Sequence, residues 1–422
     1  MTATGPAREA VARPAAGSPV RAAERVAAID VLRGFAVLGI LAMNVQSYSM
    51  VTAAYLNPVA NDKLAGSGVW VWFVSHVFFD MKFMSIFSTL FGAGMALMSE
   101  RAAARGVPAT GVHYRRQLWL LLLGLAHAHL IWYGDILVPY ALCGFLLYSL
   151  RNLRPSRLLV GGFAMTAVTP VLFLSIAAAV PNMPPDARAA LGAGWTPPAA
   201  EVEAETATYQ SGWATQLPAR SIAALELETF VFLMVFLWRS GGLMLVGMGL
   251  YKLGVLSARS SPAFYRRMAS LGFALGLPVV LLGVLYNTRH DFAFEHSMFQ
   301  GQTFNYVGSI GVFLGYVGLV MLAVQNGWLP ALQRRLQAAG RMAFTNYISQ
   351  SVICTLIFYG HGLGLYEQVS RLGQAGIVVA IWVLQLTWSP WWLARFRFGP
   401  LEWLWRSLTY MKFQPMAVSS PA

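Results

Sequence analysis

The sequence predicts an all-α integral membrane protein with about ten transmembrane helices and both termini in the cytoplasm. The first observation is composition, because 57% of the 422 residues are hydrophobic and only 11% are charged. A soluble domain carries roughly twice that share of charge. The second observation is a series of apolar stretches, since roughly 20 apolar residues are needed to cross about 30 Å of hydrocarbon. Ten such stretches occur, at 29–51, 69–98, 116–134, 136–150, 157–180, 229–251, 268–287, 304–324, 341–360 and 373–394.

The third observation is the distribution of basic residues, which predicts the orientation. Of the 30 lysines and arginines, 23 lie in alternate gaps between the apolar stretches or in the terminal segments. Short loops rich in Lys and Arg stay on the cytoplasmic side, so both termini are expected there. The net charge of +13 would suggest a nucleic-acid partner in a soluble chain. Membrane topology explains that charge here, and no nucleic acid is expected.

The chain divides into segments by composition. Residues 1–28 are rich in Ala, Arg and Pro and lack the apolar core of a signal peptide, which predicts a disordered cytoplasmic arm. A proline- and glutamate-rich outside segment at 181–228 is too short and polar for a catalytic domain but long enough for a lid. The expected divisions are 1–28, an N-terminal transmembrane half at 29–228, a C-terminal half at 229–398, and an interfacial amphipathic helix with its tail at 399–422.

Ionisable residues inside the second apolar stretch form the main candidate site. His76, Asp80 and Lys82 occur together there, and charged groups at membrane depth cost a few kcal/mol each. His76 and Asp80 are four residues apart, so they share a helix face, and the carboxylate can orient the imidazole as a general base. The alternative is an ion-pair cluster in which Asp80 and Lys82 neutralise each other.

The third apolar stretch supplies two further histidines. His127 lies near its midpoint, where it either faces His76 across a cavity or packs as a neutral, hydrogen-bonded residue. His129 is two residues on and therefore lies on a different helix face, so a shared metal ion is not expected. Cys143 and Cys354 lie in apolar stretches, which fits neither a disulfide framework nor a thiolate metal site.

Polar residues near the ends of other stretches complete the candidate set. Asp30 and Arg33 open the first stretch, where Arg33 can reach headgroups or a bound phosphate, and Asn44 lies about 21 Å further along that helix. Arg239 lies mid-helix in the sixth stretch, a position that calls for an anionic partner, and Asp80 is one candidate. The remaining members are Asp135 after the third stretch and Asn346 in the ninth.

Several sequence motifs are spread over nearly the whole chain. They are Asp30-Val31-Leu32-Arg33-Gly34-Phe35-Ala36, Met43-Asn44, Lys82-Phe83, Phe87-Ser88-x-Leu90-Phe91-Gly92, Gly124-x-x-His127, Trp132-x-Gly134-Asp135, Gly340-Arg341-Met342-Ala343-Phe344-Thr345-Asn346-Tyr347, Gln350-Ser351 and Gly399-Pro400-Leu401-Glu402-Trp403. Together they resemble the YeiB-like bacterial membrane proteins, a family whose domain has no known function. The resemblance implies a multi-pass protein of the bacterial cytoplasmic (inner) membrane.

The first-helix motif is also similar, more distantly, to transmembrane acyltransferases such as heparan-α-glucosaminide N-acetyltransferase. That resemblance implies transfer of an acyl group from cytoplasmic acyl-CoA to a hydroxyl or amine acceptor at or beyond the membrane. Arg33, next to Asp30, would hold the CoA phosphates, His76 oriented by Asp80 would be the base, and Asn44 would polarise the thioester. The animal enzyme's histidine lies further upstream of its aspartate, so His127 is a substitute for the base.

Two other functions stay open. The first is a transporter or flippase for a small metabolite or lipid, in which the buried ionisable residues form a proton-coupled path, although no inverted repeat or Gly/Pro-broken helix pair is visible. The second is a non-catalytic membrane partner. The expected substrate-binding residues are Lys82, Asp135, Arg239 and Asn346, and no metal is expected. Expected partners are membrane lipids and a small-molecule or glycan acceptor, with a homodimer as an open option.

Overall fold

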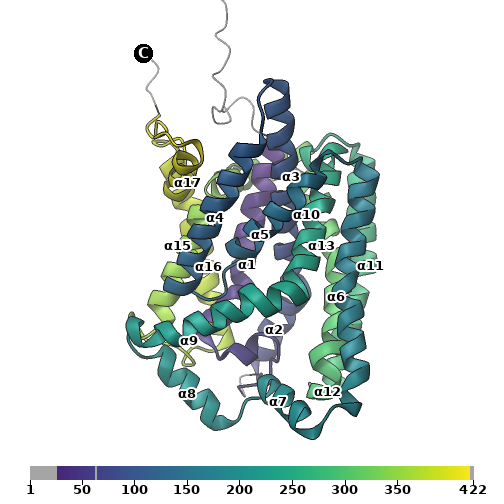
Figure 1. Cartoon of the computed structure of the whole chain (residues 1–422), viewed down its shortest axis with the longest axis vertical. Helices are drawn as coiled ribbons and strands as arrows, with labels where there is room; N and C mark the ends of the chain where they lie inside the picture. Colours follow the sequence, from purple (N-terminus) through teal and green to yellow (C-terminus); the bar gives the residue numbers. More distant parts are fainter. Residues whose placement is uncertain (1–25, 62–63, 419–422) are drawn as a thin grey trace, which may run out of the picture.

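The protein is a bundle of helices that run roughly parallel to one long axis (Figure 1). A computed structural model describes residues 26–61 and 64–418. Within these ranges the regular elements are helical, apart from one isolated antiparallel bridge between Phe396 and Ala417. Residues 1–25 of the arm predicted to be disordered, 1–28, lie outside the described residues. The first helix begins at Ala27, inside the predicted arm.

The described residues form α-helices numbered α1 to α17, and the longest of them follow the apolar stretches of the sequence. They are α1 (Ala27–Ser49), α2 (Ser67–Phe78), α3 (Lys82–Ala104), α4 (Thr110–Leu130), α5 (Leu137–Leu147), α6 (Pro155–Ala179), α7 (Pro185–Trp195), α8 (Ala199–Tyr209), α9 (Trp213–Glu226), α10 (Leu237–Lys252), α11 (Pro262–Arg289), α12 (Phe294–His296), α13 (Gln302–Gln325), α14 (Pro330–Arg341), α15 (Ala343–Phe358), α16 (Arg371–Leu393) and α17 (Pro400–Tyr410).

Seven helical stretches in the described part of the chain are long and apolar enough to cross a membrane. They are Ala27–Ser49, Ser67–Ala104, Pro155–Asn182, Trp213–Lys252, Pro262–Arg289, Phe294–Gln325 and Arg371–Leu393, with the shorter apolar helix α15 in addition. The protein is therefore all-helical and multi-pass, as predicted. The expected count of about ten is not reached by these criteria. The predicted spans 116–134, 136–150 and 341–360 correspond to α4, α5 and α15, which are not among the seven stretches.

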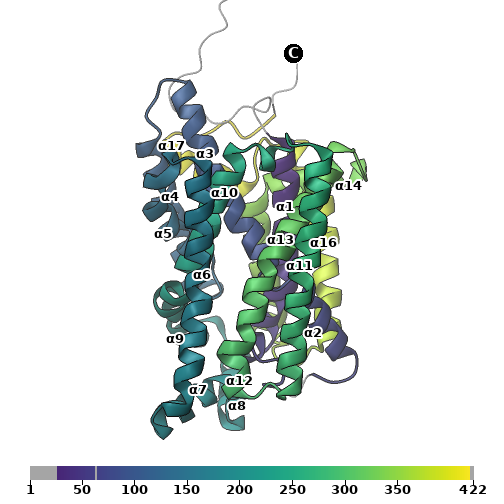
Figure 2. The same ribbon diagram turned by 90° about the vertical axis from the view of Figure 1, so that its right-hand side faces the viewer.

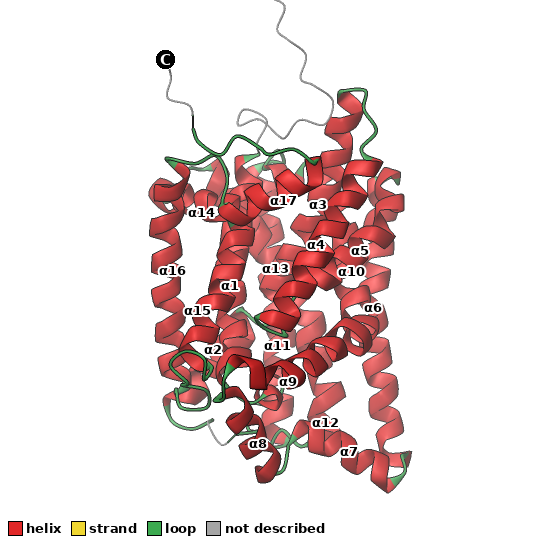
Figure 3. Cartoon of the chain, turned by 60° about the vertical axis from the view of Figure 1, so that its left-hand side comes forward, coloured by secondary structure: helices red, strands yellow, loops and turns green. Residues whose placement is uncertain are grey.

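The two ends of the bundle differ (Figure 3). At one end, called here the α17 end, α17 lies across the helices. Glu402 accepts hydrogen bonds from the backbone N–H groups of Phe344 (2.7 Å) and Thr345 (3.2 Å), which caps the N-terminus of α15. Burial raises the pKa of this carboxyl above its usual range. The indole of Trp405 donates to the carbonyl of Arg116 at 3.0 Å, so α17 is attached to both α15 and α4.

At the opposite end, called here the α8 end, residues 181–228 form three short helices, α7, α8 and α9. Glu205 of α8 accepts hydrogen bonds from the backbone N–H and side-chain hydroxyl of Thr52, both at 2.8 Å, and from the hydroxyl of Tyr366 at 2.9 Å. Arg188 of α7 forms a surface ion pair with Glu295 of α12 at 2.7 Å. The segment is therefore held down onto the ends of the long helices.

Two long helices, α11 and α13, lie side by side along their length (Figure 2). The glycines of the Gly311-x-x-x-Gly315 pattern face Gly272 and Gly276, so closely that a Cβ on Gly272 would lie 2.5 Å from the Gly315 nitrogen. Small residues at such a seam allow two membrane helices to approach closely. This contact holds α13 in place, and α13 supplies several of the polar residues described below.

The second predicted span, 69–98, is not one continuous helix. It is interrupted between Phe78 and Lys82, where Met81 adopts a left-handed conformation with φ 62°. Two side chains satisfy carbonyls at the end of α2: Lys82 Nζ donates to His76 O at 2.7 Å, and the Tyr316 hydroxyl donates to Phe78 O at 3.0 Å. Because backbone groups inside a membrane need partners, these two bonds allow the break to exist without Gly or Pro.

Candidate functional site

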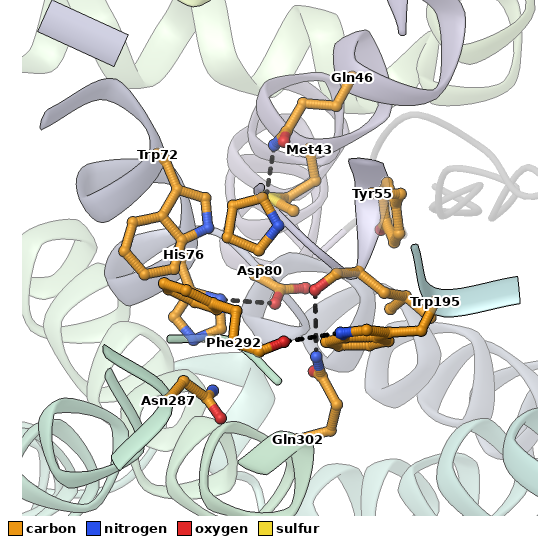
Figure 4. Close-up of a pocket in the computed structure, with 12 residues that line it drawn as sticks. Met43, Gln46, Tyr55, Trp72, His76, Asp80, Trp195, Asn287, Phe292 and Gln302 are labelled. Carbon is orange, nitrogen blue, oxygen red and sulfur yellow. Dashed lines mark hydrogen bonds and ion pairs between the residues drawn. The ribbon is translucent and has the colours of Figure 1, made fainter. Parts of the chain in front are cut away.

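A small cavity lies near the α8 end, next to the break between α2 and α3. Its free volume is about 20 Å³, enough for roughly one water molecule. The wall is formed by residues of α1, α2, α7, α11, α13 and their connections (Figure 4): Met43, Gln46, Tyr55, Leu56, Pro58, Trp72, His76, Asp80, Trp195, Asn287, Phe292 and Gln302. It is an enclosed polar and aromatic site, and α7 covers it through Trp195.

His76 and Asp80 form a pair in this wall. His76 Nδ1 lies 3.2 Å from Asp80 Oδ2, and both side chains are largely buried (Figure 4). The ring of Trp72 stacks on the imidazole with centroids 5.4 Å apart. The pair comes from the end of α2 and the break that follows it, rather than from one helix face. With Nδ1 held by the carboxylate and the ring held by Trp72, Nε2 is the nitrogen left for chemistry.

Lys82 and Asp80 are connected through Asn305 of α13. Asn305 donates to Asp80 Oδ2 at 2.7 Å, and its Oδ1 accepts from Lys82 Nζ at 2.6 Å. Lys82 is fully buried, does not line the cavity, and caps α2 through its bond to the His76 carbonyl. It therefore holds neighbouring residues of the site in position. The predicted alternative was an ion-pair cluster in which Asp80 and Lys82 neutralise each other. In the structure the two side chains are instead connected through the amide of Asn305.

Arg239 does not pair with Asp80. Its guanidinium donates to Tyr306 O (2.8 Å), Ser85 Oγ (2.9 Å) and Ser309 Oγ (2.6 Å). It also lies 4.4 Å from the centre of the Tyr306 ring. These neutral groups together disperse the charge and tie α10 to α3 and α13, so Arg239 is a buried connector rather than part of the cavity wall.

A second histidine–aspartate pair lies outside this cavity. His127 Nδ1 is 2.7 Å from Asp135 Oδ1, and His127 Nε2 is 2.9 Å from Ser351 Oγ. The hydroxyl of Tyr48 lies 2.7 Å from the same serine oxygen. His127 therefore does not face His76 across the cavity. His129 points to a different partner, Glu228, at 3.4 Å, so the two histidines of α4 lie on different faces.

The remaining candidates are spread over the molecule. Asp30 and Arg33 form an ion pair of 2.8 Å at the α17 end, with the Arg33 side chain about one-third exposed. Asn44 is half-buried on α1 and is not in the cavity wall. Asn346 donates to Ala339 O and Ser389 Oγ, both at 3.1 Å, and accepts from Trp388. Its amide therefore joins α14, α15 and α16.

Sequence reasoning missed several members of these sites. Asn305, Trp72 and Gln46 escaped notice because each is an ordinary helix residue without a charge. Ser351 stands in the Gln350-Ser351 motif, yet nothing in the sequence connects it to His127, 224 positions away. Contacts of this kind depend on which helices are neighbours, and hydropathy does not supply that.

Among groups of His, Cys, Asp and Glu, the described part of the chain holds no cluster of three or more that could bind a metal ion. The cysteines, Cys143 and Cys354, are both buried and free.

Comparison with known proteins identifies the family. Residues 250–412 match the model described as a protein of unknown function (DUF418). The chain is 31% identical over 397 residues to uncharacterized protein YeiB of Escherichia coli (strain K12), covering 92% of this chain and 96% of that protein. It is 31% identical over 421 residues to uncharacterized protein YxaH of Bacillus subtilis (strain 168), covering 94% and 98%. This chain belongs to the YeiB-like family.

Proposed function

We propose that this protein is a transmembrane acyltransferase of the bacterial cytoplasmic membrane, with about ten passes and both termini inside. It moves an acyl group from cytoplasmic acyl-CoA to a hydroxyl or amine acceptor at or beyond the opposite face. The observation that carries the proposal is the His76–Asp80 pair in the wall of an enclosed cavity. A largely buried imidazole that is oriented by a carboxylate and lines a cavity is suited to remove a proton from an acceptor.

The reaction assigns a task to each group. His76 Nε2 takes the proton of the acceptor O–H or N–H, and the freed lone pair attacks the thioester carbonyl carbon. The carbon–sulfur bond breaks, and the CoA thiolate leaves with a proton from the imidazolium. Asp80 stabilises the imidazolium in between. Trp72, Trp195 and Phe292 exclude bulk water from the cavity, which limits hydrolysis of the thioester.

The donor would bind at the α17 end. Arg33 lies there, and Arg116 and Arg406 are close enough for their charges to affect one another. Such a cluster suits the phosphates of CoA. Burial lowers the pKa of Arg406, as does the charge of Arg33, and a bound phosphate would relieve that repulsion. From Arg33 to Met43 at the cavity is about 15 Å along α1, so the donor's acyl arm would have to extend between the helices.

Binding of acetyl-CoA to the purified protein in nanodiscs, followed by calorimetry, tests this proposal. Saturable binding is expected for the wild type. Arg33→Ala should weaken it about tenfold through loss of charge-assisted hydrogen bonds. His76→Ala should bind normally and lose transfer. Arg188→Ala, which removes a cation at the α8 end, is the matched control and should bind like the wild type. Absence of binding by acetyl-CoA and by longer acyl-CoAs to folded protein would contradict the proposal.

Transport is the second candidate, and one observation favours it. The interruption between α2 and α3 places Asp80 and the His76 carbonyl at a helix break, an arrangement that many transporters use for substrate or ion binding. A transporter would move its substrate unmodified and respond to a proton gradient in proteoliposomes. An acyltransferase would require the acyl donor and leave a modified product.

A further inference from the structure

The hydrogen bonds around His127 run in one direction. An ionised Asp135 can only accept, so the proton between it and His127 lies on Nδ1. Nε2 must then be the acceptor, which assigns the Ser351 hydroxyl as its donor at 2.9 Å. The second oxygen of Asp135 accepts from the backbone N–H of Val138 at 2.7 Å, which fixes the carboxylate. Serine, histidine and aspartate are thus aligned as in enzymes that use a serine nucleophile.

Four separate parts of the chain build this arrangement. Tyr48 comes from α1, His127 from α4, Asp135 from the connection after α4, and Ser351 from α15. Each of the four side chains is at most 3% exposed. The Tyr48 hydroxyl, 2.7 Å from Ser351 Oγ, donates to the oxygen that gives its own proton to His127. The serine oxygen is thereby held with its proton directed at the base.

This site is separate from the His76 cavity. Gln46 of α1 lines that cavity, whereas Tyr48 lies two residues further on, about 200° around the helix. The rings next to His127 are those of Tyr347, with centroids 5.3 Å apart, and Trp132, at 6.2 Å. An aromatic surrounding of this kind favours an uncharged ligand of low polarity.

We propose that Ser351 is a nucleophile, with His127 as its base and Asp135 as the residue that positions the base. Its substrate class is an uncharged, apolar acyl ester or thioester that reaches the site from within the membrane. The activity goes beyond the acyl transfer proposed at His76 and does not depend on it.

The chemical step is a balanced acyl exchange. Ser351 Oγ attacks the carbonyl carbon while its proton moves to His127 Nε2. The bond from that carbon to the leaving oxygen or sulfur breaks, and the leaving group takes the proton from His127. The product is an acyl-serine plus an alcohol or thiol. Water or an acceptor hydroxyl, deprotonated by His127, then releases the acyl group and restores the serine.

Labelling with diisopropyl fluorophosphate tests the proposal, because this small apolar reagent enters membranes. The serine oxygen displaces fluoride from phosphorus, and peptide mass spectrometry locates the adduct. The wild-type protein in nanodiscs should be labelled at Ser351. Asp135→Asn should slow labelling at least about 100-fold, since the imidazole loses its oriented tautomer. Ser351→Ala should abolish it.

Two control variants keep the result interpretable. Ser349→Ala removes a neighbouring hydroxyl that donates to Asn346 O and accepts from Gln385 Nε2 but does not contact His127, and it should label like the wild type. His76→Ala should also label normally, so failure here is distinct from failure of acyl transfer at His76. If Ser351→Ala does not fold, the rate ratio of Asp135→Asn decides the question. Folded wild-type protein that stays unlabelled, or a rate unchanged by Asp135→Asn, would overturn the proposal.

Discussion

The molecule contains two histidine–aspartate pairs, and they differ in what surrounds them. His76 and Asp80 are 3.2 Å apart and border a cavity, with side chains 12% and 13% exposed. His127 and Asp135 are 2.7 Å apart and both 2% exposed. His76 lines the cavity and its Nε2 has no hydrogen-bond partner in the described part of the chain, whereas Nε2 of His127 is bonded to Ser351.

The backbone explains this difference. Asp80 lies in the break between α2 and α3, where the chain leaves helical geometry and space remains beside it. Asp135 lies in the tight connection between α4 and α5, and the backbone N–H of Val138 at the start of α5 bonds its carboxylate. An interrupted helix therefore leaves a cavity beside the first pair, whereas in the second pair both histidine nitrogens are already hydrogen-bonded.

The largest expected difference between the pairs is in stability. Asp135→Ala leaves the His127 and Val138 N–H groups without an acceptor in a dry interior, at a cost of about 3 kcal/mol or more. Asp80→Ala should cost only about 1–2 kcal/mol, because water in the adjoining cavity can solvate His76 and Asn305. Unfolding of both variants in the same detergent, followed by circular dichroism, measures the two losses.

A matched variant separates charge from hydrogen bonding. Asp135→Asn keeps an acceptor oxygen for Val138, so it should recover part of the loss seen in Asp135→Ala. Equal destabilisation by Asp135→Ala and Asp80→Ala would remove the distinction between a closed and an open pair.

The same contrast shows what sequence could predict. Hydropathy located the long helices well: the predicted span 157–180 corresponds to Pro155–Ala179, and 373–394 to Arg371–Leu393. Each of these helices satisfies its backbone hydrogen bonds within its own segment, so the local composition is enough to predict where it lies. The break at Met81 was missed because neither Gly nor Pro marks it, and because one of its caps, Tyr316, is 238 residues from Phe78.

Site residues follow the same rule. The contact between His76 and Asp80 was predicted from their spacing of four residues on one helix face, and it forms although Asp80 lies in the break after α2. The contact of His127 with Ser351 depends on α4 and α15 being neighbours, and no local pattern encodes that. Asn346 and Arg239 were predicted to be polar groups at membrane depth, and their bonds to Ser389 and Ser309 join them to neutral side chains on other helices.

A smaller effect is expected in chemical reactivity. Diethyl pyrocarbonate should modify His76 at least about tenfold faster than His127, equivalent to about 1.4 kcal/mol in activation free energy. The reason is that His76 lines the cavity and has no hydrogen-bond partner on Nε2 in the described part of the chain, while both nitrogens of His127 are bonded. Peptide mass spectrometry over time gives both rates in one sample, with exposed His296 as an internal reference.

Trp195→Ala sharpens this measurement, because it removes the α7 side chain that covers the cavity. It should accelerate modification of His76 and leave His127 unchanged. Equal rates at the two histidines in the wild-type protein would mean that the cavity does not admit even a small reagent.

The smallest effect concerns the ion pair between Arg188 of α7 and Glu295. This pair helps to hold α7 over the cavity beside His76, and it has no counterpart at the His127 site. A hydrogen bond from Arg188 lowers the pKa of Glu295. A carboxyl with a lowered folded-state pKa stabilises the fold above its unfolded pKa of about 4.3 and loses that contribution as pH falls through the folded value. Because both side chains are 43% exposed, solvent screens the pair, and such pairs contribute roughly 0.2–1 kcal/mol.

Hydrogen exchange of the α7 amides in Arg188→Gln, relative to wild type at the same pH, measures this contribution. At pH 7 and low salt the ratio should be at most about fivefold, the equivalent of 1 kcal/mol. It should fall to one only when the pH is below the lowered folded-state pKa of Glu295, where the carboxyl is protonated in both states, and also at 1 M salt. The amides around His127 should not respond under any of these conditions. A ratio of one at pH 7 would show that Trp195 and the bonds of Asn57 to Trp195 O hold α7 without the ion pair.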